Sequence, residues 1–574
     1  MIKKTGTTPW DSETGAIRKS WVGRTSIALV YPNTYGVGMA NLGFQSVYRL
    51  LNDDEGIVCE RAFLPARESR EKQDKPQKLV SIESGRPLKD FQVIAFSVSF
   101  ENDFLNILDI IHLAGLPLRS NARGDSHPLL IAGGVACLLN PEPLASFIDC
   151  FLVGEAEALL LPFIHLIREN MDRHTLLKRL AANVPGAYVP RFYDARYHPD
   201  GTLAAFEPNR ANVPQKVKRI YPADISDIPT STAVLSSASA FDSAYLTEVS
   251  RGCTHGCRFC SAGFIYRPPR YRSKECLIAE CLKASAVTDR VGLVGTAISD
   301  HPDITDVCRH PELSHLRFAY SSLRADAVTA DHLAVLAASG TKTATIAPEA
   351  GSERMRTVIN KGITEAQILS AAESLVKAGI MNLKLYFMIG LPGELPEDIT
   401  ETIALCKKIR SVFLETSREK GRMGQITVGV SSFVPKASTP FQWAAMDTAD
   451  SLKKKIKTLK SGINPIPNIT VTADSPRGAI IQALLSRGDR TVSDLLEAAH
   501  ANQGNWASTL KSAAHAPGLF IHRERSEDEL FPWDFIDIGI HKSFLRSEYQ
   551  RAIEIKPSAP CPVVGCNRCG VCGG

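Results

Sequence analysis

Three cysteines within one short run constrain this chain more than any other feature. Cys253, Cys257 and Cys260 follow one another with the spacing C-x3-C-x2-C. Iron–sulfur clusters are held by closely spaced cysteine thiolates, and a cubane normally needs four of them. Three local ligands therefore leave one iron open, as catalysis requires. The alternative is a zinc site or three unrelated thiols, but zinc needs a fourth ligand, and His255 lies inside the loop itself.

The composition of the chain sets broad limits on its class. Its 574 residues predict three or four domains, and 44% hydrophobic with 22% charged residues is ordinary for a globular protein. The net charge of +5 is weak evidence for a nucleic-acid partner. The sequence contains no apolar run of membrane-spanning length, and residues 1–10 lack an apolar signal core. We therefore expect a cytoplasmic protein with no membrane partner.

A second cysteine group crowds the end of the chain. Cys561, Cys566, Cys569 and Cys572 have the spacing C-x4-C-x2-C-x2-C. Clustered cysteines in a cytosolic chain indicate metal sites rather than disulfides. Four thiolates can close either a second iron–sulfur cluster or a structural zinc site, and the sequence leaves both open.

The apolar pattern predicts an α/β fold in several parts. Residues 1–195 alternate buried strands with helical stretches, which indicates a Rossmann-like, doubly wound parallel sheet. The strands are expected at 26–31, 93–98, 129–134 and 150–155. Ligands of such sheets bind at the carboxyl ends of the strands.

The rest of the chain divides at changes of pattern. Residues 196–235 are proline-rich and form the expected linker. Residues 236–445 hold six strand–helix units, which predict a partial (β/α)6 barrel of the TIM type with the first cysteine loop at its mouth. Residues 446–555 are expected to be mainly helical, and 556–574 form the Cys-rich tail.

The run Arg251-Gly-Cys-Thr-His-Gly-Cys-Arg-Phe-Cys-Ser261 resembles the motif of the radical SAM superfamily. The resemblance implies a 4Fe–4S cluster whose open iron chelates S-adenosylmethionine (SAM). It also implies reductive cleavage of SAM to methionine and a 5′-deoxyadenosyl radical. An electron donor of the flavodoxin or ferredoxin type is expected, and the sequence leaves the substrate unspecified. The whole chain, tail included, resembles a radical SAM group with a cobalamin-binding-like N-terminal domain.

That N-terminal resemblance covers residues 25–170. Gly133-Gly134 and Val153-Gly-Glu-Ala-Glu157 stand where the cobalamin-binding type has its Gly-Gly and Gly-Glu-x-Glu turns. The Asp-x-His-x-x-Gly motif that ligates cobalamin in many such domains is missing. Either cobalamin binds without a protein ligand and supports methyl transfer, or the domain only packs on the core. The segment Phe433–Pro440 resembles the methylthiotransferases, but their N-terminal three-cysteine domain is missing.

The resemblance also places the SAM-binding residues. The methionine ammonium is expected near the turn after the second barrel strand, and its carboxylate on an arginine, which suits carboxylates. The ribose is expected on a carboxylate and a hydroxyl, and the adenine beside an aromatic ring and a glycine turn. The candidates for the ammonium are Gly295, Thr296 and Asp300, and those for the carboxylate are Arg324 or Arg354. The candidates for the ribose are Glu349 and Ser352, and those for the adenine are Phe259 and Gly390. Instead of binding SAM, the two arginines could form ordinary salt bridges, and Gly390 could belong to a plain strand–helix turn.

Two other functions remain open from sequence alone. The chain could modify RNA or a ribosomal component, with the basic run Arg267-Pro-Pro-Arg-Tyr-Arg272 and the tail docking the nucleic acid. A strongly salt-dependent affinity would reveal it. The same run is otherwise a solvated basic loop. The third function is that of a non-catalytic iron–sulfur or zinc-binding protein.

Overall fold

The N-terminal part folds around one six-stranded sheet. The computed structural model describes residues 10, 12–65, 78–169, 171–321, 323–419, 421, 423–512, 517–562 and 565–572. The strands follow the order β2-β1-β3-β4-β5-β6 and are parallel except for the antiparallel edge strand β6. This is the 2-1-3-4-5 order of flavodoxin-like sheets, which bind ligands beyond the carboxyl ends of the strands. The bounds are β1 Thr25–Tyr31, β2 Ile57–Phe63, β3 Val93–Ser97, β4 Leu129–Gly133, β5 Cys150–Leu152 and β6 Ala187–Tyr188.

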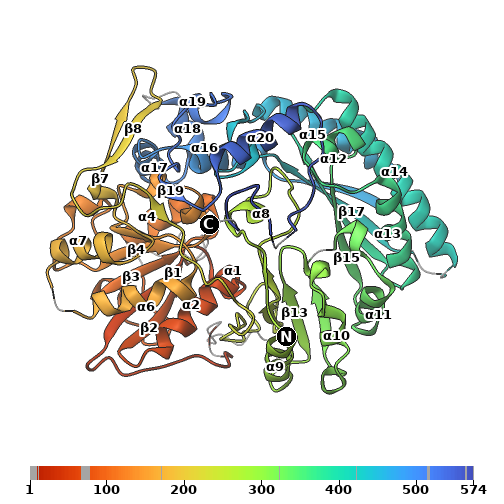
Figure 1. The fold of residues 1–574 in the computed structure, drawn as a ribbon. Coiled ribbons are helices and arrows are strands. Elements are labelled where there is room, and N and C mark those ends of the chain that lie inside the picture. Colours follow the sequence, from red (N-terminus) through yellow and green to blue (C-terminus); the bar gives the residue numbers. More distant parts are fainter. Residues whose placement is uncertain are drawn as a thin grey trace.

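The four strands expected in this part are confirmed as β1, β3, β4 and β5, whereas β2 was not predicted. Helices flank the sheet (Figure 1). They are α1 Tyr35–Met39, α2 Leu42–Asp53, α4 Phe104–Leu113, α5 Val135–Leu139, α6 Ala156–Ile167 and α7 Arg173–Asn183.

Helix α2 packs one face on the core and turns another toward a cavity. The Asn41 side chain caps it by accepting a hydrogen bond from the backbone N–H of Phe44, at 2.9 Å. Phe44 and Tyr48 are fully buried, whereas Leu42 and Val47 are only partly buried. Both of these side chains line a cavity instead.

The central part forms the expected partial barrel. All six predicted strands are present and run parallel within two sheets, β10-β13-β14 and β15-β16-β17-β18. A parallel bridge between Leu323 and Ile346 connects the two sheets. The bounds are β10 Tyr245–Glu248, β13 Arg290–Val294, β14 Arg317–Tyr320, β15 Thr343–Glu349, β16 Asn382–Ile389, β17 Gln425–Ser432 and β18 Ile469–Ala473.

Strand β18 is a seventh strand that the sequence analysis did not predict. It lies within the region expected to be mainly helical and pairs with β17. The larger helices around the barrel are α9 Lys274–Ser285, α11 Ala330–Ala338, α13 Glu365–Lys377 and α14 Pro396–Glu419. The short helix α8 Ala262–Ile265 precedes α9, and the short helices α10 Ile304–Cys308 and α12 Glu353–Val358 lie between the larger helices in sequence.

The C-terminal region lies along both lobes (Figure 1). Its helices are α15 Ala449–Ile463, α16 Pro476–Arg487, α17 Val492–Ala501, α18 Trp506–Lys511, α19 Gly518–Ile521 and α20 Lys542–Ile553. The expected linker contains structure: β7 Tyr193–Tyr197 and β8 Leu203–Pro208 form an antiparallel pair, and β9 Val217–Lys218 pairs with β19 Ile536–Asp537. Ion pairs also cross between the parts, including Lys436–Glu101 at 2.5 Å and Arg490–Glu142 at 2.9 Å.

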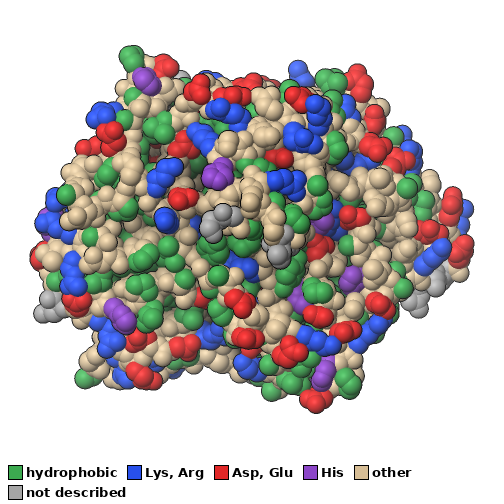
Figure 2. Space-filling model, viewed as in Figure 1, with side chains coloured by type: hydrophobic (Ala, Val, Ile, Leu, Met, Phe, Trp, Pro, Cys, Tyr) green, Lys and Arg blue, Asp and Glu red, His purple; other side chains and the backbone are tan. Residues whose placement is uncertain are grey.

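The surface mixes both signs of charge. Figure 2 shows Lys and Arg interspersed with Asp and Glu over the face that carries the C-terminal tail. Among the helices that the structure describes, none combines the length and apolar character needed to span a bilayer.

Candidate active site

A cavity of about 640 Å³ lies where the N-terminal sheet faces the barrel. From the sheet side it is lined by the carboxyl ends of β3 and β4, including Ser97 and Gly133, and by segments that follow β1 and β5, including Asn41. From the barrel side it is lined by residues that end β10 and β13 and by Gly252 at the start of the first cysteine loop. The carboxyl ends of both parallel sheets thus converge on one space, the usual place for a ligand in each fold.

Two glycines of the expected turns are required by their geometry. Gly134 has φ +105°, and a Cβ there would lie 2.4 Å from the Val98 carbonyl oxygen. Gly154 has φ +142°, and its Cβ would lie 2.1 Å from the Ile220 carbonyl oxygen. L side chains rarely adopt such backbone angles, so both turns depend on glycine to bring backbone close to the cavity.

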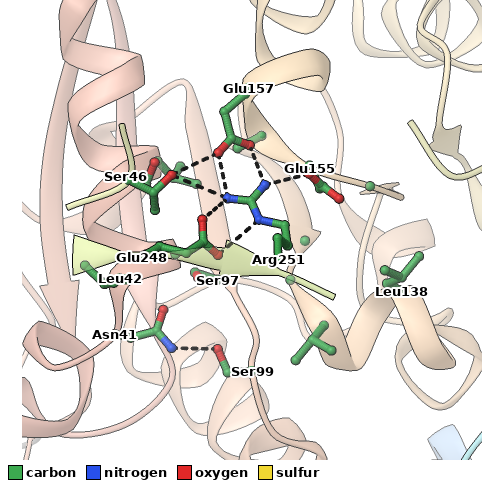
Figure 3. Close-up of a pocket in the computed structure, with 18 of the residues that line it drawn as sticks. Asn41, Leu42, Ser46, Ser97, Ser99, Leu138, Glu155, Glu157, Glu248 and Arg251 are labelled. Carbon is green, nitrogen blue, oxygen red and sulfur yellow. Dashed lines mark hydrogen bonds and ion pairs between the residues drawn. The ribbon is translucent and has the colours of Figure 1, made fainter. Parts of the chain in front are cut away.

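Arg251 lies in this cavity at the centre of three carboxylates (Figure 3). Its guanidinium is 2.6 Å from Glu155, 2.9 Å from Glu157 and 2.7 Å from Glu248. Glu155 and Glu157 belong to the Gly-Glu-x-Glu turn of the N-terminal part, whereas Arg251 lies two residues before Cys253. The network therefore fixes the start of the cysteine loop against the N-terminal sheet. The structure assigns Arg251 a positioning role that the motif alone did not reveal.

The basic run after the cysteine loop is neither solvated nor available to nucleic acid. Arg267, Arg270 and Arg272 are 6%, 6% and 2% exposed. Arg270 makes a bidentate pair with Glu155, at 2.6 and 3.0 Å, and Arg272 contacts Glu248 at 2.5 Å. Both expectations for this run were wrong: Arg270 and Arg272 pair with buried carboxylates that also hold Arg251, whereas Arg267 donates to the Gly263 carbonyl and packs over Phe264 and Phe544. The run looks like an exposed basic loop in the sequence because the carboxylates that pair with Arg270 and Arg272 lie elsewhere in the chain.

The first cysteine loop connects β11 (Ser250–Arg251) to α8. Cys257 is buried, and Cys253 and Cys260 are partly buried. Burial raises the pKa of the Cys253 thiol to about 12; a bound metal ion deprotonates such a ligand outright. Among the described residues, no three His, Cys, Asp or Glu side chains are grouped so as to hold a metal ion as they stand. The donor chemistry of three soft thiolates in one glycine-flanked loop nevertheless fits an iron–sulfur cluster.

Acidic and basic groups surround this loop. His255 lies 2.8 Å from Asp300, and the Thr254 hydroxyl donates to the same carboxylate at 3.3 Å. Burial works against the charged form of Asp300, but the hydrogen bond from His255 lowers its pKa below the usual range. Asp300, a candidate for the methionine ammonium, thus lies against the cysteine loop, where it contacts His255.

Arg324 and Lys361 lie near Cys257, and Glu349 pairs with Lys361. The sequence analysis did not identify Lys361 as part of the site. Lys361 is 3.2 Å from Glu349, and both side chains are largely buried. Burial raises the pKa of Glu349 despite the neighbouring ammonium group. Glu349 also has φ +67°, an unusual backbone angle for a non-glycine residue at a strand end. Arg324 is held in place by a bidentate pair with Asp326, at 3.0 and 2.9 Å.

The remaining candidates for SAM binding do not all gather in one place. Gly295 and Thr296 line the 640 Å³ cavity. Arg354 and Gly390 line a different depression of about 1030 Å³, which the C-terminal region borders. Ser352 is buried, and its hydroxyl caps α12 while donating to Asp398 at 2.6 Å. Phe259 is partly buried against the main core.

The C-terminal cysteines lie next to the first loop. Cys561, Cys566 and Cys569 line a small pocket with Gly256, and the backbone N–H of Cys561 donates to the Thr254 carbonyl at 2.7 Å. Cys572 is exposed. Two cysteine groups that are 300 residues apart in sequence therefore meet at the barrel mouth.

Comparisons with known proteins agree with this geometry. Residues 43–190 match the family "Radical SAM proteins, N-terminal", and residues 247–406 match the radical SAM superfamily. The protein MJ0966 of Methanocaldococcus jannaschii is 30% identical over 477 residues, which cover 82% of this chain and 90% of that protein. The chain belongs to the radical SAM superfamily and is a radical SAM enzyme, a class that uses a 4Fe–4S cluster and SAM.

Its fold is shared with a solved member of that class. The radical SAM methyltransferase TsrM from Kitasatospora setae, solved with cobalamin and a [4Fe–4S] cluster bound, is 14% identical, with a TM-score of 0.50. The match covers 85% of this chain and all of that one. The expected combination of a cobalamin-binding-like N-terminal region and a radical SAM core is confirmed. The alternative of a non-catalytic metal-binding protein is therefore wrong.

Proposed function

We propose that this radical SAM enzyme binds cobalamin in the 640 Å³ cavity and transfers a methyl group. The observation that carries the proposal is the position of the cavity. It opens at the carboxyl edge of a flavodoxin-like sheet and reaches Gly252 of the first cysteine loop and the Gly295-Thr296 turn. A corrin held there would lie beside the place where SAM is expected. Cobalamin supplies a transferable methyl group when bound, and the cluster supplies the electron that cleaves SAM.

The lining of the cavity suits a large, mainly apolar cofactor. Leu42, Val47, Leu138 and Phe163 contribute apolar surface, and Gly133 leaves room for close backbone approach. The described lining residues include no histidine, in keeping with the missing Asp-x-His-x-x-Gly motif. Cobalamin in this cavity would therefore have no imidazole ligand from the protein. The fold shared with TsrM, whose printed description includes bound cobalamin, supports the same assignment.

We assign the first cluster to Cys253, Cys257 and Cys260, and SAM to the groups around their loop. Gly295 and Thr296 offer backbone to the methionine ammonium, with Asp300 oriented by His255 nearby. Arg324 is the cation for the methionine carboxylate, since it lies near the cysteine loop and Arg354 lines the other depression. Glu349, held by Lys361, is the acceptor for the ribose, and Phe259 packs on the adenine.

Modification of RNA is not favoured, because the arginines of the basic run that would dock it are buried, and Arg270 and Arg272 are paired with carboxylates. Methyl transfer to a substrate that enters between the two lobes fits the described cavity better.

The test is to fill the cavity by mutation. Val47→Trp places a bulky side chain into the cavity from α2, whereas Asp53→Trp places the same side chain on the exposed end of that helix. The proteins are made in cells supplied with cobalamin and purified without oxygen, and cobalt and corrin absorbance are measured. We expect cobalamin in the wild type and in D53W, and its loss from V47W. A wild type without cobalamin, or a V47W protein that retains it, would contradict the proposal.

A further inference from the structure

We propose that Cys561, Cys566, Cys569 and Cys572 hold a second iron–sulfur cluster that delivers electrons to the first. This inference rests on the proposed first cluster at Cys253, Cys257 and Cys260. It gives the C-terminal tail an electron-transfer role and not a purely structural one.

The first argument is position. The hydrogen bond from the Cys561 N–H to the Thr254 carbonyl is 2.7 Å long, and Thr254 follows Cys253 directly. Standard bond lengths then place the Cα atoms of Cys561 and Cys253 no more than about 11 Å apart. The tail cysteines are thus held beside the first cysteine loop. A cluster that exchanges electrons with the first must lie this close.

The second argument is that the segment just before the tail, which contains Lys556 and Ser558, is hydrogen-bonded to the first cysteine loop and its neighbours. Arg258, which lies between Cys257 and Phe259, is fully buried and donates to the Lys556 carbonyl at 2.7 Å and to the Ser558 hydroxyl at 3.1 Å. Asn360 bridges the two segments, since its side chain donates to the Gly256 carbonyl at 3.1 Å and accepts from the Ser558 N–H at 2.9 Å. The two cysteine groups are therefore held in a fixed relation by buried polar contacts.

The third argument is ligand chemistry. The run Cys566-x2-Cys569-x2-Cys572 repeats the C-x2-C-x2-C spacing of bacterial ferredoxins, and Cys561 is followed by proline, as is the fourth cysteine of that run. Arg267 and Arg568 line the small pocket with the tail cysteines. Two cations beside a cluster favour its reduced form, which carries one more negative charge. Cys572, the exposed member, is the one that an external donor can approach.

The electron step needs no bond to form or break. One electron leaves a reduced flavin or iron–sulfur donor protein, which is oxidised by one electron. It reduces the tail site from its 2+ to its 1+ state and then passes to the first cluster, which restores the tail site to 2+. No proton is transferred in either step.

Metal analysis of the full chain tests the site. With iron and sulfide reconstitution under anaerobic conditions, we expect about eight irons per chain in the wild type and about four in the triple variant C253A/C257A/C260A. The triple variant should also give a cluster EPR signal after reduction with dithionite. The matched control Cys276→Ala, which removes a partly buried thiol outside both groups, should keep about eight. Zinc in place of iron in the triple variant, or no metal there, would overturn the proposal.

A second variant tests the electron path and guards against a triple variant that does not fold. In C561A/C566A/C569A/C572A we expect about four irons, and we compare SAM cleavage driven by reduced flavodoxin with that driven by dithionite. The ratio of the two rates should fall by about tenfold or more relative to the wild type. An unchanged ratio would refute the relay. Because neither readout involves cobalamin, failure here is separate from failure of the methyl-transfer proposal.

Discussion

At the scale of single residues, Arg251 contacts three carboxylates at once. Its 11% exposed side chain neutralises carboxylates from both lobes, Glu155 and Glu157 on one side and Glu248 on the other. Removing one member of a buried ionic network leaves its partners charged and desolvated. The residue therefore links the fold of the N-terminal part to the position of the cysteine loop.

We expect Arg251→Ala to lower the free energy of unfolding by about 3–5 kcal/mol. The control is Arg196→Ala, which breaks an exposed pair with Glu207 at 2.8 Å and should cost less than about 1 kcal/mol. Urea unfolding followed by circular dichroism measures both. Equal losses in the two variants would show that the buried network contributes nothing special.

Asp103 gives a pH-dependent prediction. Burial raises its pKa from 3.8 to about 6, although Asn33 and Asn106 donate hydrogen bonds to it at 2.8 and 3.1 Å. The folded state thus binds the proton more tightly than the unfolded chain does. Stability from this group is present at acidic pH and is lost as pH rises from about 4 through 6.

We therefore expect wild-type stability, measured relative to Asp103→Asn, to fall by roughly 2–3 kcal/mol between about pH 4 and pH 7. Urea midpoints of both proteins across this range provide the measurement. A difference that is independent of pH, or one that grows in favour of the wild type at pH 7, would contradict the assignment.

At the scale of elements, the start of α12 shows how a predicted ligand-binding residue can serve the fold. The buried Ser352 hydroxyl accepts from the Met355 N–H at 3.0 Å and donates to Asp398 at 2.6 Å. Both of its hydrogen-bonding roles are thus taken by the helix start and by α14.

We predict that Ser352→Ala destabilises the protein by about 2 kcal/mol, because it removes a cap and a bond to a charged acceptor. Thr364→Ala, which removes the exposed cap of α13, should cost about 1 kcal/mol. Thermal unfolding ranks the two. If SAM protects the wild type and S352A equally against unfolding, the Ser352 hydroxyl stabilises the helix and does not bind SAM. A loss of protection by SAM in S352A would instead show that the hydroxyl contributes to SAM binding.

The elements also show why sequence patterns were sufficient in some places and not in others. Strand β1 was predicted because burial at every position leaves a continuous apolar run, and β16 because its buried residues recur at every second position. Strand β2, Ile57–Phe63, contains the buried Glu60 and Arg61; Arg61 pairs with Glu83, and Glu60 accepts a hydrogen bond from Ser81. These partners allow two polar side chains to be buried within a strand, which the apolar pattern alone does not indicate. Strand β18 does alternate buried with exposed residues, as a strand should, but it is short and lies between helices.

The same reasoning applies to the site. The two cysteine groups were evident because metal ligands have a local spacing. Lys361, His255 and the burial of Arg270 follow from contacts between residues far apart in sequence, for which one sequence gives no signal. The split of the SAM candidates between two depressions is likewise set by how the C-terminal region packs on the barrel.

At the scale of the whole molecule, the lobes are joined by a buried seam. Lys436, from the segment that follows the barrel strand β17, reaches Glu101 of the N-terminal part at 2.5 Å. Glu101 also accepts from Ser486 at 2.8 Å and from Gln482 at 3.1 Å, both in α16. One carboxylate thus connects the N-terminal sheet, the barrel and the C-terminal helices. The cavity that we assign to cobalamin lies between the first two, so its shape depends on this seam.

We expect Glu101→Ala to leave Lys436 at the seam without a carboxylate partner, with only the Ser486 hydroxyl as an acceptor at 3.0 Å, and to cost about 3–5 kcal/mol. The loss should appear as a separation of the lobes before either unfolds, since each keeps its own core contacts. Limited proteolysis during a urea titration should then cut between the lobes at a lower urea concentration than in the wild type. The control Glu497→Ala removes an exposed seam pair with Arg119 and should shift the cut by an amount equivalent to less than about 1 kcal/mol. A single cooperative transition that moves by the same amount in both variants would show that Glu101 does not couple the three parts.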